Sequence, residues 1–433
     1  MTQVDPRPAE HEAAASPRAV KVLIINDYGV LAGGAERVSV LLRDGLRSRG
    51  HDARLFASTA LPVRSENPAD YTCFGSESQL RRALQVANPW AFRTLRQVIG
   101  EFEPEVIHVR MFLAQLSPLI LPLIRDVPSL LHLGSYQLIC PLNTKRLPDG
   151  SSCRHVAGKA CYRAGCISLP GLGRVAVQLG LWQRWRDVFD MIVANSEWLA
   201  GRYRDDGFAV NEVIWNGTPV GPARRPLRDP PTVAYAGRLV HKKGVDVLLR
   251  AFAANAASVP ESRLLIVGDG PQRSELERLV AELEIEHQVV LSGYLERHEL
   301  ERALGSAWVQ AIPSRYEEPF PNVAIESMMR GTAVVATALG GSTEIVRDGH
   351  TGYLVASNDV EALASRLRKL ITDRALAEAA GAAGREVALA DFPASRMDER
   401  FELAYRGIIS AVGAEPRVRL GSTKSDHETP AST

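Results

Sequence analysis

Short apolar runs alternate with longer segments of helical periodicity along most of the chain. Residues 21–28 (KVLIINDY) have the pattern of a buried strand, and apolar residues recur at helical spacing over 35–49. A linker rich in proline and arginine occupies 220–231, and the same alternation restarts at Thr232. Strands that alternate with helices in both halves predict an α/β fold of two Rossmann-like, doubly wound domains that face each other across a cleft.

This pattern also sets the expected boundaries. We expect a disordered lead at 1–19, an N-terminal domain at 20–219 and a linker at 220–231. A C-terminal domain at 232–393, a closing helix at 394–412 and a disordered tail at 413–433 would follow. The lead lacks the apolar core of a signal peptide. Prolines and charged residues interrupt the most apolar later stretch, 112–133, so it cannot form one membrane-spanning helix.

Composition narrows the class of protein but identifies no partner. With 45% hydrophobic residues, 23% charged residues and a net charge of +1, the chain has the make-up of a globular enzyme and lacks the basic excess typical of nucleic-acid binding. Five cysteines in 433 residues, without an export signal, indicate a reducing compartment. We therefore expect a cytoplasmic protein with no nucleic-acid partner.

The segment 307–338 has the pattern of a strand, a loop, a helix at 321–330 and a second strand. The loop carries Glu318 and the helix carries Glu326, at the carboxyl end of a predicted parallel strand, where ligands of open α/β sheets bind. The simpler alternative is a helix-start charge at Glu318 and an ordinary surface charge at Glu326.

Two predicted helix N-termini suit an anion. Pro321 fits the first helical position, so the backbone amides of Asn322 and Val323 are expected to point toward a ligand. In the first half, Gly33 and Gly34 lie between a strand and a helix, where glycine lets backbone amides approach an anion. A tight turn would require the same two glycines.

One loop of the second half carries two cations, Arg238 and Lys243. Fixed cations beside a helix N-terminus suit a diphosphate leaving group, because negative charge grows on its bridging oxygen as the bond breaks. Taken singly, each could be a surface charge. No Asp-x-Asp pair occurs in the sequence, so we expect protein cations rather than a metal ion to hold the diphosphate.

Four of the five cysteines lie in one long loop at 134–170: Cys140, Cys153, Cys161 and Cys166. They invite a zinc hypothesis, with His155 as a further ligand. Their spacing is irregular and contains no CxxC pair, so a folded loop with unpaired thiols is the better interpretation.

The helical region at 77–102 is basic and aromatic along part of its length, through Arg81, Arg82, Trp90, Phe92, Arg93 and Arg96. Such a face could contact an anionic membrane or a lipid-linked substrate. A solvated helix face would have the same composition.

Six motifs follow one another in a fixed order through the second half. They are GRLVHKKG, IVGDGP, SGYLERHEL, PSRYEEPFPNVAIESMMRGTAVVAT, GGSTEIV and DGHTGYLV. With them, the chain resembles glycosyltransferase family 4, whose members are retaining transferases with two Rossmann-like domains, the GT-B architecture. The match runs over most of 20–412. The resemblance implies a nucleotide sugar as co-substrate and no cofactor.

The resemblance also implies roles for individual residues. Arg238 and Lys243 would hold the donor diphosphate, Glu318 would lie by the transferred sugar, and Glu326 would bind the ribose. These roles fit the charge argument made above for the same loop and helix.

Three further donor contacts are implied in the same way. The loop with Gly33 and Gly34 would approach the donor phosphate from the first domain. The segment 293–295, with Tyr294 and Leu295, would lie beside the nucleotide base.

One position departs from the family pattern. Members with a Cys-Pro loop usually have a sugar-contacting histidine six residues before that cysteine, but here Gly134 holds that place, and His132 lies two residues earlier. Either His132 serves in its stead, as a candidate sugar contact, or it is a packed side chain and the contact is absent.

The family implies transfer of a sugar to an acceptor hydroxyl with its anomeric configuration kept, with the departing diphosphate oxygen taking the acceptor's proton. A glycan or lipid-linked acceptor and a location at the inner face of the membrane are the accompanying expectations. A sugar-nucleotide epimerase of the same architecture, which needs no acceptor, and a non-catalytic sugar-nucleotide binder remain the alternatives.

Overall fold

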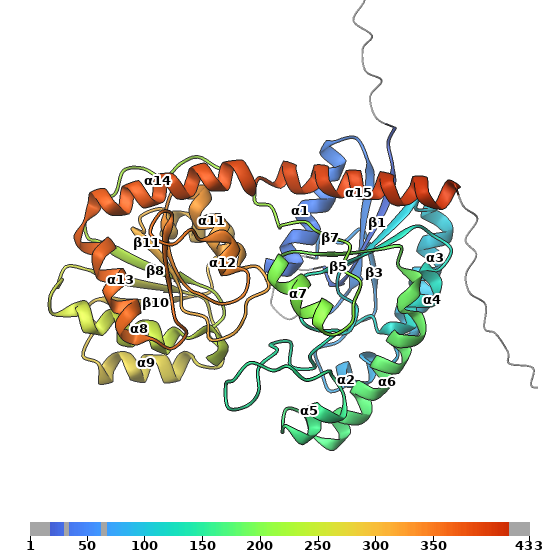
Figure 1. Cartoon of the computed structure of the whole chain (residues 1–433), viewed down its shortest axis with the longest axis horizontal. Helices are drawn as coiled ribbons and strands as arrows, with labels where there is room; N and C mark the ends of the chain where they lie inside the picture. The colour runs from blue at the N-terminus through green and yellow to red at the C-terminus, as the bar shows by residue number, and fades with distance from the viewer. Residues whose placement is uncertain (1–17, 30–33, 62–66, 415–433) are drawn as a thin grey trace, which may run out of the picture.

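The computed structural model describes residues 18–29, 34–61 and 67–414. Two parallel sheets lie side by side, each covered by helices on both faces, and form two domains (Figure 1). The predicted pair of Rossmann-like α/β domains is therefore confirmed. Within the described residues, no helix combines the length and the apolar character needed to cross a bilayer.

The N-terminal sheet has seven parallel strands in the order β3-β2-β1-β4-β5-β6-β7. Its strands are β1 (Lys21–Tyr28), β2 (Asp52–Ser58), β3 (Tyr71–Cys73), β4 (Val106–Val109), β5 (Ser129–Leu133), β6 (Met191–Ala194) and β7 (Glu212–Val213). Its helices are α1 (Gly34–Ser48), α2 (Arg81–Leu84), α3 (Pro89–Phe102), α4 (Leu121–Ile124), α5 (Lys159–Arg163), α6 (Leu169–Trp185) and α7 (Glu197–Asp205). The strand order reverses between β1 and β4, which is where such sheets bind ligands.

The C-terminal sheet has six parallel strands in the order β10-β9-β8-β11-β12-β13. Its strands are β8 (Thr232–Ala236), β9 (Arg263–Val267), β10 (Val289–Gly293), β11 (Val309–Ile312), β12 (Ala333–Thr337) and β13 (Gly352–Val355). Its helices are α8 (Val245–Ala256), α9 (Arg273–Glu282), α10 (Arg297–Leu304), α11 (Asn322–Arg330), α12 (Ser342–Ile345), α13 (Val360–Thr372) and α14 (Arg374–Asp391). Here the order reverses between β8 and β11, the strands that precede the predicted cations and glutamates.

The last helix, α15 (Ala394–Ala414), returns to the N-terminal domain (Figure 1). Met397, Phe401 and Tyr405 are buried in the same apolar cluster as residues of α1 and β1. The chain therefore crosses between the domains twice. The two crossings touch, because Thr218 N donates to Phe392 O at 2.9 Å and Ala394 N donates to Thr218 O at 2.9 Å.

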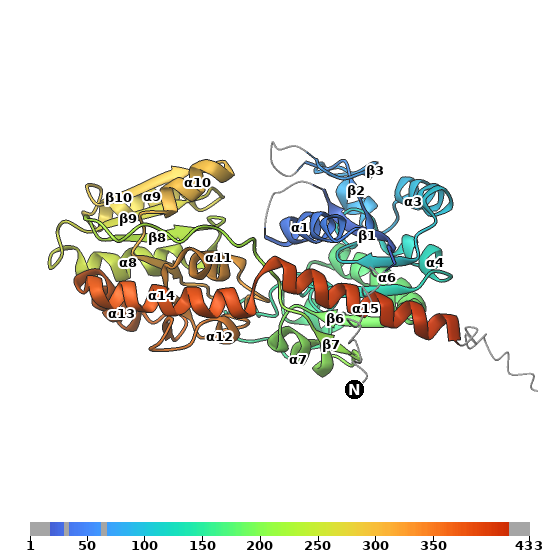
Figure 2. The same ribbon diagram turned by 90° about the horizontal axis from the view of Figure 1, so that it is seen from above.

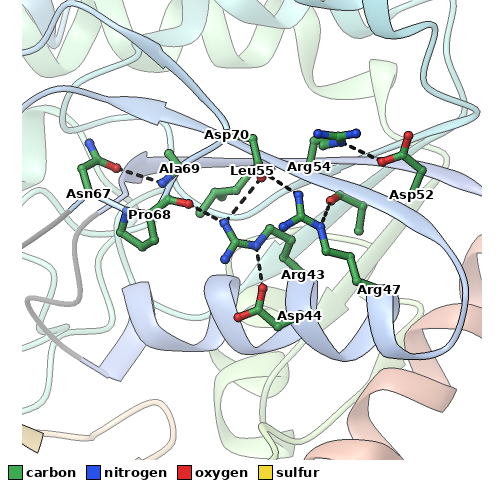
Figure 3. Close-up of polar contacts among 11 residues, drawn as sticks. Arg43, Asp44, Arg47, Asp52, Arg54, Leu55, Asn67, Pro68, Ala69 and Asp70 are labelled. Atoms are coloured by element: carbon green, nitrogen blue, oxygen red, sulfur yellow. Dashed lines mark hydrogen bonds and ion pairs between the residues drawn. The ribbon is translucent and has the colours of Figure 1, made fainter.

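Helix α1 is fixed to the strands beside it by a cluster of arginines (Figure 3). Arg47 Nη2 lies 2.6 Å from Asp70 Oδ1, and Arg43 donates to the Pro68 carbonyl oxygen. Asp70 also accepts a hydrogen bond from Leu55 N of β2 at 2.8 Å. These bonds tie the second half of α1 to the chain that leads into β3, and through Asp70 to β2.

Several predicted elements have different limits. The helical region at 77–102 divides at Asn88, whose side chain caps α3 at Ala91 N. Pro321 is the residue before α11 rather than its first helical residue, with ψ of 93°. The three-residue strand β3 had no apolar run long enough to indicate it.

Candidate functional site

The cation loop, residues 237–244, connects β8 to α8. Gly244 has φ of 67°, and a Cβ there would lie 2.1 Å from the Pro313 carbonyl oxygen. Only glycine allows this approach. The loop therefore lies directly against the chain that follows β11.

Glu318 and Lys243 meet at this contact. Lys243 Nζ lies 2.8 Å from Glu318 Oε2, and the Ser314 hydroxyl donates to Glu318 Oε1. Glu318 is only 6% exposed, so the carboxylate is held by its partners rather than by water. The structure thus brings together two residues that the sequence placed 75 positions apart.

The loop that carries Glu318 is held from its other side by the Gly-Gly motif. Gly340 has φ of 65°, and a Cβ there would lie 2.2 Å from Glu318 O. Gly341 N donates to Glu318 O at 2.8 Å. The two glycines therefore let the backbone after β12 contact the Glu318 loop directly.

Lys242 is a third cation of the cation loop that the sequence analysis did not single out. Its Nζ lies 4.6 Å from the centre of the Tyr316 ring. Burial, followed by the charges of Arg238 and Lys243, lowers the pKa of Lys242 to about 8. The side chains of Lys242 and Arg238 form no ion pair within the described part of the chain. Its position beside the expected Lys243 was the available sequence signal.

Glu326 lies on α11 and is engaged from both domains. Its Oε1 lies 2.9 Å from Arg37 Nη1 of α1, and its Oε2 lies 3.6 Å from Arg297 Nη1 of α10. In Figure 2, α1 and α11 face each other between the domains. Arg37 was not predicted, because nothing in its local sequence indicates a partner 289 residues away.

The first turn of α1 approaches the cation loop as well. Gly34 is the first residue of α1, whereas Gly33 lies outside the described residues. Burial raises the pKa of the half-buried Glu36 against the attraction of Arg110 and Arg238. Arg238 of one domain and α1 of the other therefore interact electrostatically.

The remaining predicted donor contacts have mixed surroundings. Tyr294 is 54% exposed, and Leu295 packs against a small apolar cluster that includes Leu304 and Ala307. Asn322 accepts a hydrogen bond from Asn216 Nδ2 at 2.9 Å through its side chain, and Val323 packs on the apolar cluster of α11. An exposed aromatic ring at the end of β10 is available for stacking on a base.

A second contact joins the domains through α7. Glu344 accepts hydrogen bonds from the backbone N–H of Glu197 and Trp198 at 2.9 and 2.7 Å, at the N-terminus of that helix. Glu317, next to Glu318, lies 3.0 Å from Arg202 Nε of the same helix. Helix α7 thus holds the Glu318 loop against the N-terminal domain.

His132 is a buried side chain of the core in this structure, and its role as a sugar contact stays a prediction. It is fully buried, its Nδ1 lies 3.2 Å from His108 Nε2, and its ring lies 4.9 Å from that of Phe401 on α15. The space beside Gly134 is occupied instead by Arg110, whose Nη2 would lie 3.0 Å from a Cβ there. Arg110 and Gly134 line a hollow at the ends of β4 and β5.

The cysteine loop gains no support as a metal site. All four of its cysteines are free thiols; three are buried, and Cys166 is half-buried. Among the residues that the structure describes, no three His, Cys, Asp or Glu side chains are grouped so that they could hold a metal ion. Burial raises the pKa of Cys161 and Cys166, which keeps both thiols protonated.

Two family models match the chain, one in each domain. The model described as glycosyl transferases group 1 matches residues 223–387, and the model described as glycosyltransferase family 4 matches residues 32–136. The first range contains the cation loop, Glu318 and Glu326. The second contains α1 and β4.

Curated relatives match over part of their length. A GDP-mannose-dependent alpha-(1-6)-phosphatidylinositol monomannoside mannosyltransferase of Mycolicibacterium smegmatis is 37% identical over 169 residues, which cover 38% of this chain and 44% of the relative. A D-inositol 3-phosphate glycosyltransferase of Nocardioides is 35% identical over 225 residues, which cover 45% of this chain and 49% of the relative. The chain thus spans less than half the length of these relatives.

Solved structures share the fold over nearly the whole chain. A sucrose-phosphate synthase from Thermosynechococcus elongatus has a TM-score of 0.69 at 24% identity and covers 90% of this chain and 99% of its own. HepE of Anabaena, in complex with UDP and glucose, has a TM-score of 0.66 at 19% identity; the match covers 89% of this chain and 99% of HepE. These likenesses establish the GT-B architecture. The two family models and the curated relatives identify the chain as a glycosyltransferase of the family 4 type.

Proposed function

We propose that the protein is a retaining glycosyltransferase that moves a sugar from a UDP- or GDP-sugar to a hydroxyl of a glycan, lipid-linked or small-molecule acceptor. The observation that carries this proposal is the charge of the cation loop. Arg238, Lys242 and Lys243 lie together, and Glu318 is the carboxylate that pairs with one of them. Lys242 is half-buried and has no carboxylate partner among the described residues, and the exposed Arg238 adds a second charge beside it. A half-buried cation is costly unless an anion binds, and a diphosphate supplies that anion.

In this proposal Arg238 and Lys243 stabilise the leaving group. The bond between the anomeric carbon and the diphosphate oxygen breaks while the acceptor oxygen bonds to the same face of that carbon. The departing oxygen takes the acceptor's proton, so no protein base is required. Glu318 keeps Lys243 in place and lies where the transferred sugar would meet the end of β11.

The nucleotide would extend from this loop toward α11 and β10. Glu326 would accept hydrogen bonds from the ribose hydroxyls, and the exposed ring of Tyr294 would lie beside the base. Gly33 and Gly34 would approach the phosphates from the other domain, and the α11 N-terminus at Asn322 and Val323 would add its dipole.

The acceptor would bind to the N-terminal domain. Trp90 of α3 and Leu169 of α6 are large apolar side chains that are 47% and 64% exposed. Together with the arginines of α2 and α3, they suit peripheral contact with an anionic membrane that carries a lipid-linked acceptor. This role belongs with polysaccharide or glycoconjugate biosynthesis.

A thermal-shift panel of UDP-, GDP- and ADP-sugars tests the proposal. A ligand at 100 times its dissociation constant stabilises the folded state by about 2.7 kcal/mol. We expect a clear rise in melting temperature with one nucleotide class, and the same rise with the corresponding free nucleoside diphosphate. The absence of a shift with every compound would refute the assignment.

A further inference from the structure

The ion pair between Arg37 and Glu326 crosses from one domain to the other. The nitrogen and oxygen are 2.9 Å apart, and the two side chains are 24% and 15% exposed. Because both groups are largely withdrawn from water, the contact is stronger than an exposed surface pair. Burial lowers the pKa of Arg37, and Glu326 opposes this effect.

The pair leaves one carboxylate oxygen of Glu326 less occupied. Arg37 engages Oε1, whereas the contact of Oε2 is to Arg297 at 3.6 Å, beyond hydrogen-bond distance. An ionised carboxylate has about four acceptor positions. Oε2 can therefore accept from hydroxyl groups while Arg37 keeps its bond to Oε1.

The helix that carries Arg37 is well fixed. Arg43 and Arg47 bind the chain around Asp70, as Figure 3 shows, and Arg49 Nε lies 2.8 Å from Glu402 Oε2 of α15. Arg43 and Arg47 of α1 are thus held to the chain around Asp70, and Arg49, directly after the helix ends, is held to α15. Arg37 is consequently presented to Glu326 from a rigid element.

We propose that Arg37 is a positioning residue of the donor site: by holding Oε1 of Glu326 from the opposite domain, it orients Oε2 toward the ribose hydroxyls of a nucleoside diphosphate. The inference rests on the proposed function. It means that the nucleotide site is complete only when the N-terminal domain is in place. Arg37 also offsets the charge of Glu326, which would otherwise repel a neighbouring diphosphate.

The test is a double-mutant cycle read out by calorimetric binding of UDP and GDP to the full-length protein. Arg37→Gln should weaken binding of the preferred nucleotide about tenfold, the scale of one charge-assisted hydrogen bond. In a Glu326→Gln background the same substitution should change affinity by less than about twofold. Arg37→Lys should restore part of the loss, and Arg297→Gln should weaken binding less than Arg37→Gln does.

Three results would overturn the inference. Arg37→Gln could leave affinity unchanged, reduce it equally in both backgrounds, or raise it, in which case the pair would block the site. Melting temperatures of all variants show whether a loss of binding is a loss of folding. If the wild-type protein binds neither UDP nor GDP, the proposed function fails first, which separates the two conclusions.

Discussion

The two domains share one sheet plan but build their halves of the site in different ways. In the C-terminal domain, the cation loop and the Glu318 loop are short connections after β8 and β11. Gly244 lets the cation loop contact the chain after β11, and Gly340 lets the chain after β12 contact the Glu318 loop. In the N-terminal domain, Arg37, Arg110 and Glu36 come from a helix and a strand end, and each interacts with a residue distant in sequence. The donor half therefore depends on backbone contacts, and the opposite half on side-chain charges.

The largest expected effect concerns the cation loop. Arg238→Met and Lys243→Met should each raise the activation free energy by about 3 kcal/mol, because each removes a charge that stabilises the leaving group. The turnover number should therefore fall more than a hundredfold. Initial rates of nucleotide release at saturating donor measure this. Arg250→Met, at an exposed position of α8, is the matched control. Unchanged turnover in either loop variant would remove the diphosphate assignment.

The backbone contacts of the donor half can be tested through stability. Gly340→Ala should lower the free energy of unfolding by about 3 kcal/mol, since a Cβ would overlap Glu318 O and the backbone has positive φ. Gly50→Ala has positive φ without such a neighbour and should cost about 1 kcal/mol. Urea unfolding compares the two. Equal losses would mean that the close approach at Gly340 contributes nothing beyond its backbone angle.

Glu326 lies between the two halves, and its removal should act on binding. Glu326→Ala should weaken the binding of the donor nucleotide by about 2 kcal/mol through the lost ribose contacts, with a smaller change in turnover. Calorimetry with UDP and GDP gives the affinity, and Glu386→Ala on the exposed face of α14 is the control. A variant that binds the nucleotide as tightly as the wild type does would exclude the ribose role.

The smallest effect is the pH dependence of binding. Lys242 has a pKa of about 8 without ligand, so its charge is present below that pH and is lost above it. Because a diphosphate favours the charged form, nucleotide affinity should fall severalfold between pH 8 and 9.5. Lys242→Met should bind more weakly at neutral pH and lose this decline. A decline that persists in Lys242→Met would assign it to another group.

The sequence placed the charged residues of the C-terminal domain on their loops and helix because these residues are close to one another in local motifs; their roles at a donor site stay predictions. Arg238 and Lys243 share one loop, and Glu318 and Glu326 share one βαβ unit, so an apolar pattern and a few charges were enough to place them. The contacts that the N-terminal domain makes with these residues could not be predicted from local motifs. Arg37 and Glu326 are 289 residues apart, and only the tertiary structure brings them together.

His132 illustrates the same limit within one strand. Strand alternation alone did not reveal which face of β5 would meet α15, a helix that begins at Ala394 and returns to this domain. Once α15 is in place, His132 is enclosed by His108 and Phe401, and Arg110 lies over Gly134. The sequence could not show this burial because the element that encloses the histidine is remote in sequence, and the sugar contact of His132 stays a prediction.

The return of α15 to the N-terminal domain constrains how the two domains can move. The chain crosses between them near Thr218 and again near Phe392, and these two crossings are hydrogen-bonded to each other. Because the two connections lie at one point, they keep the domains from separating there, and any rotation of one domain against the other would have its pivot at this point. A cut in either crossing would leave the other to keep the two domains joined.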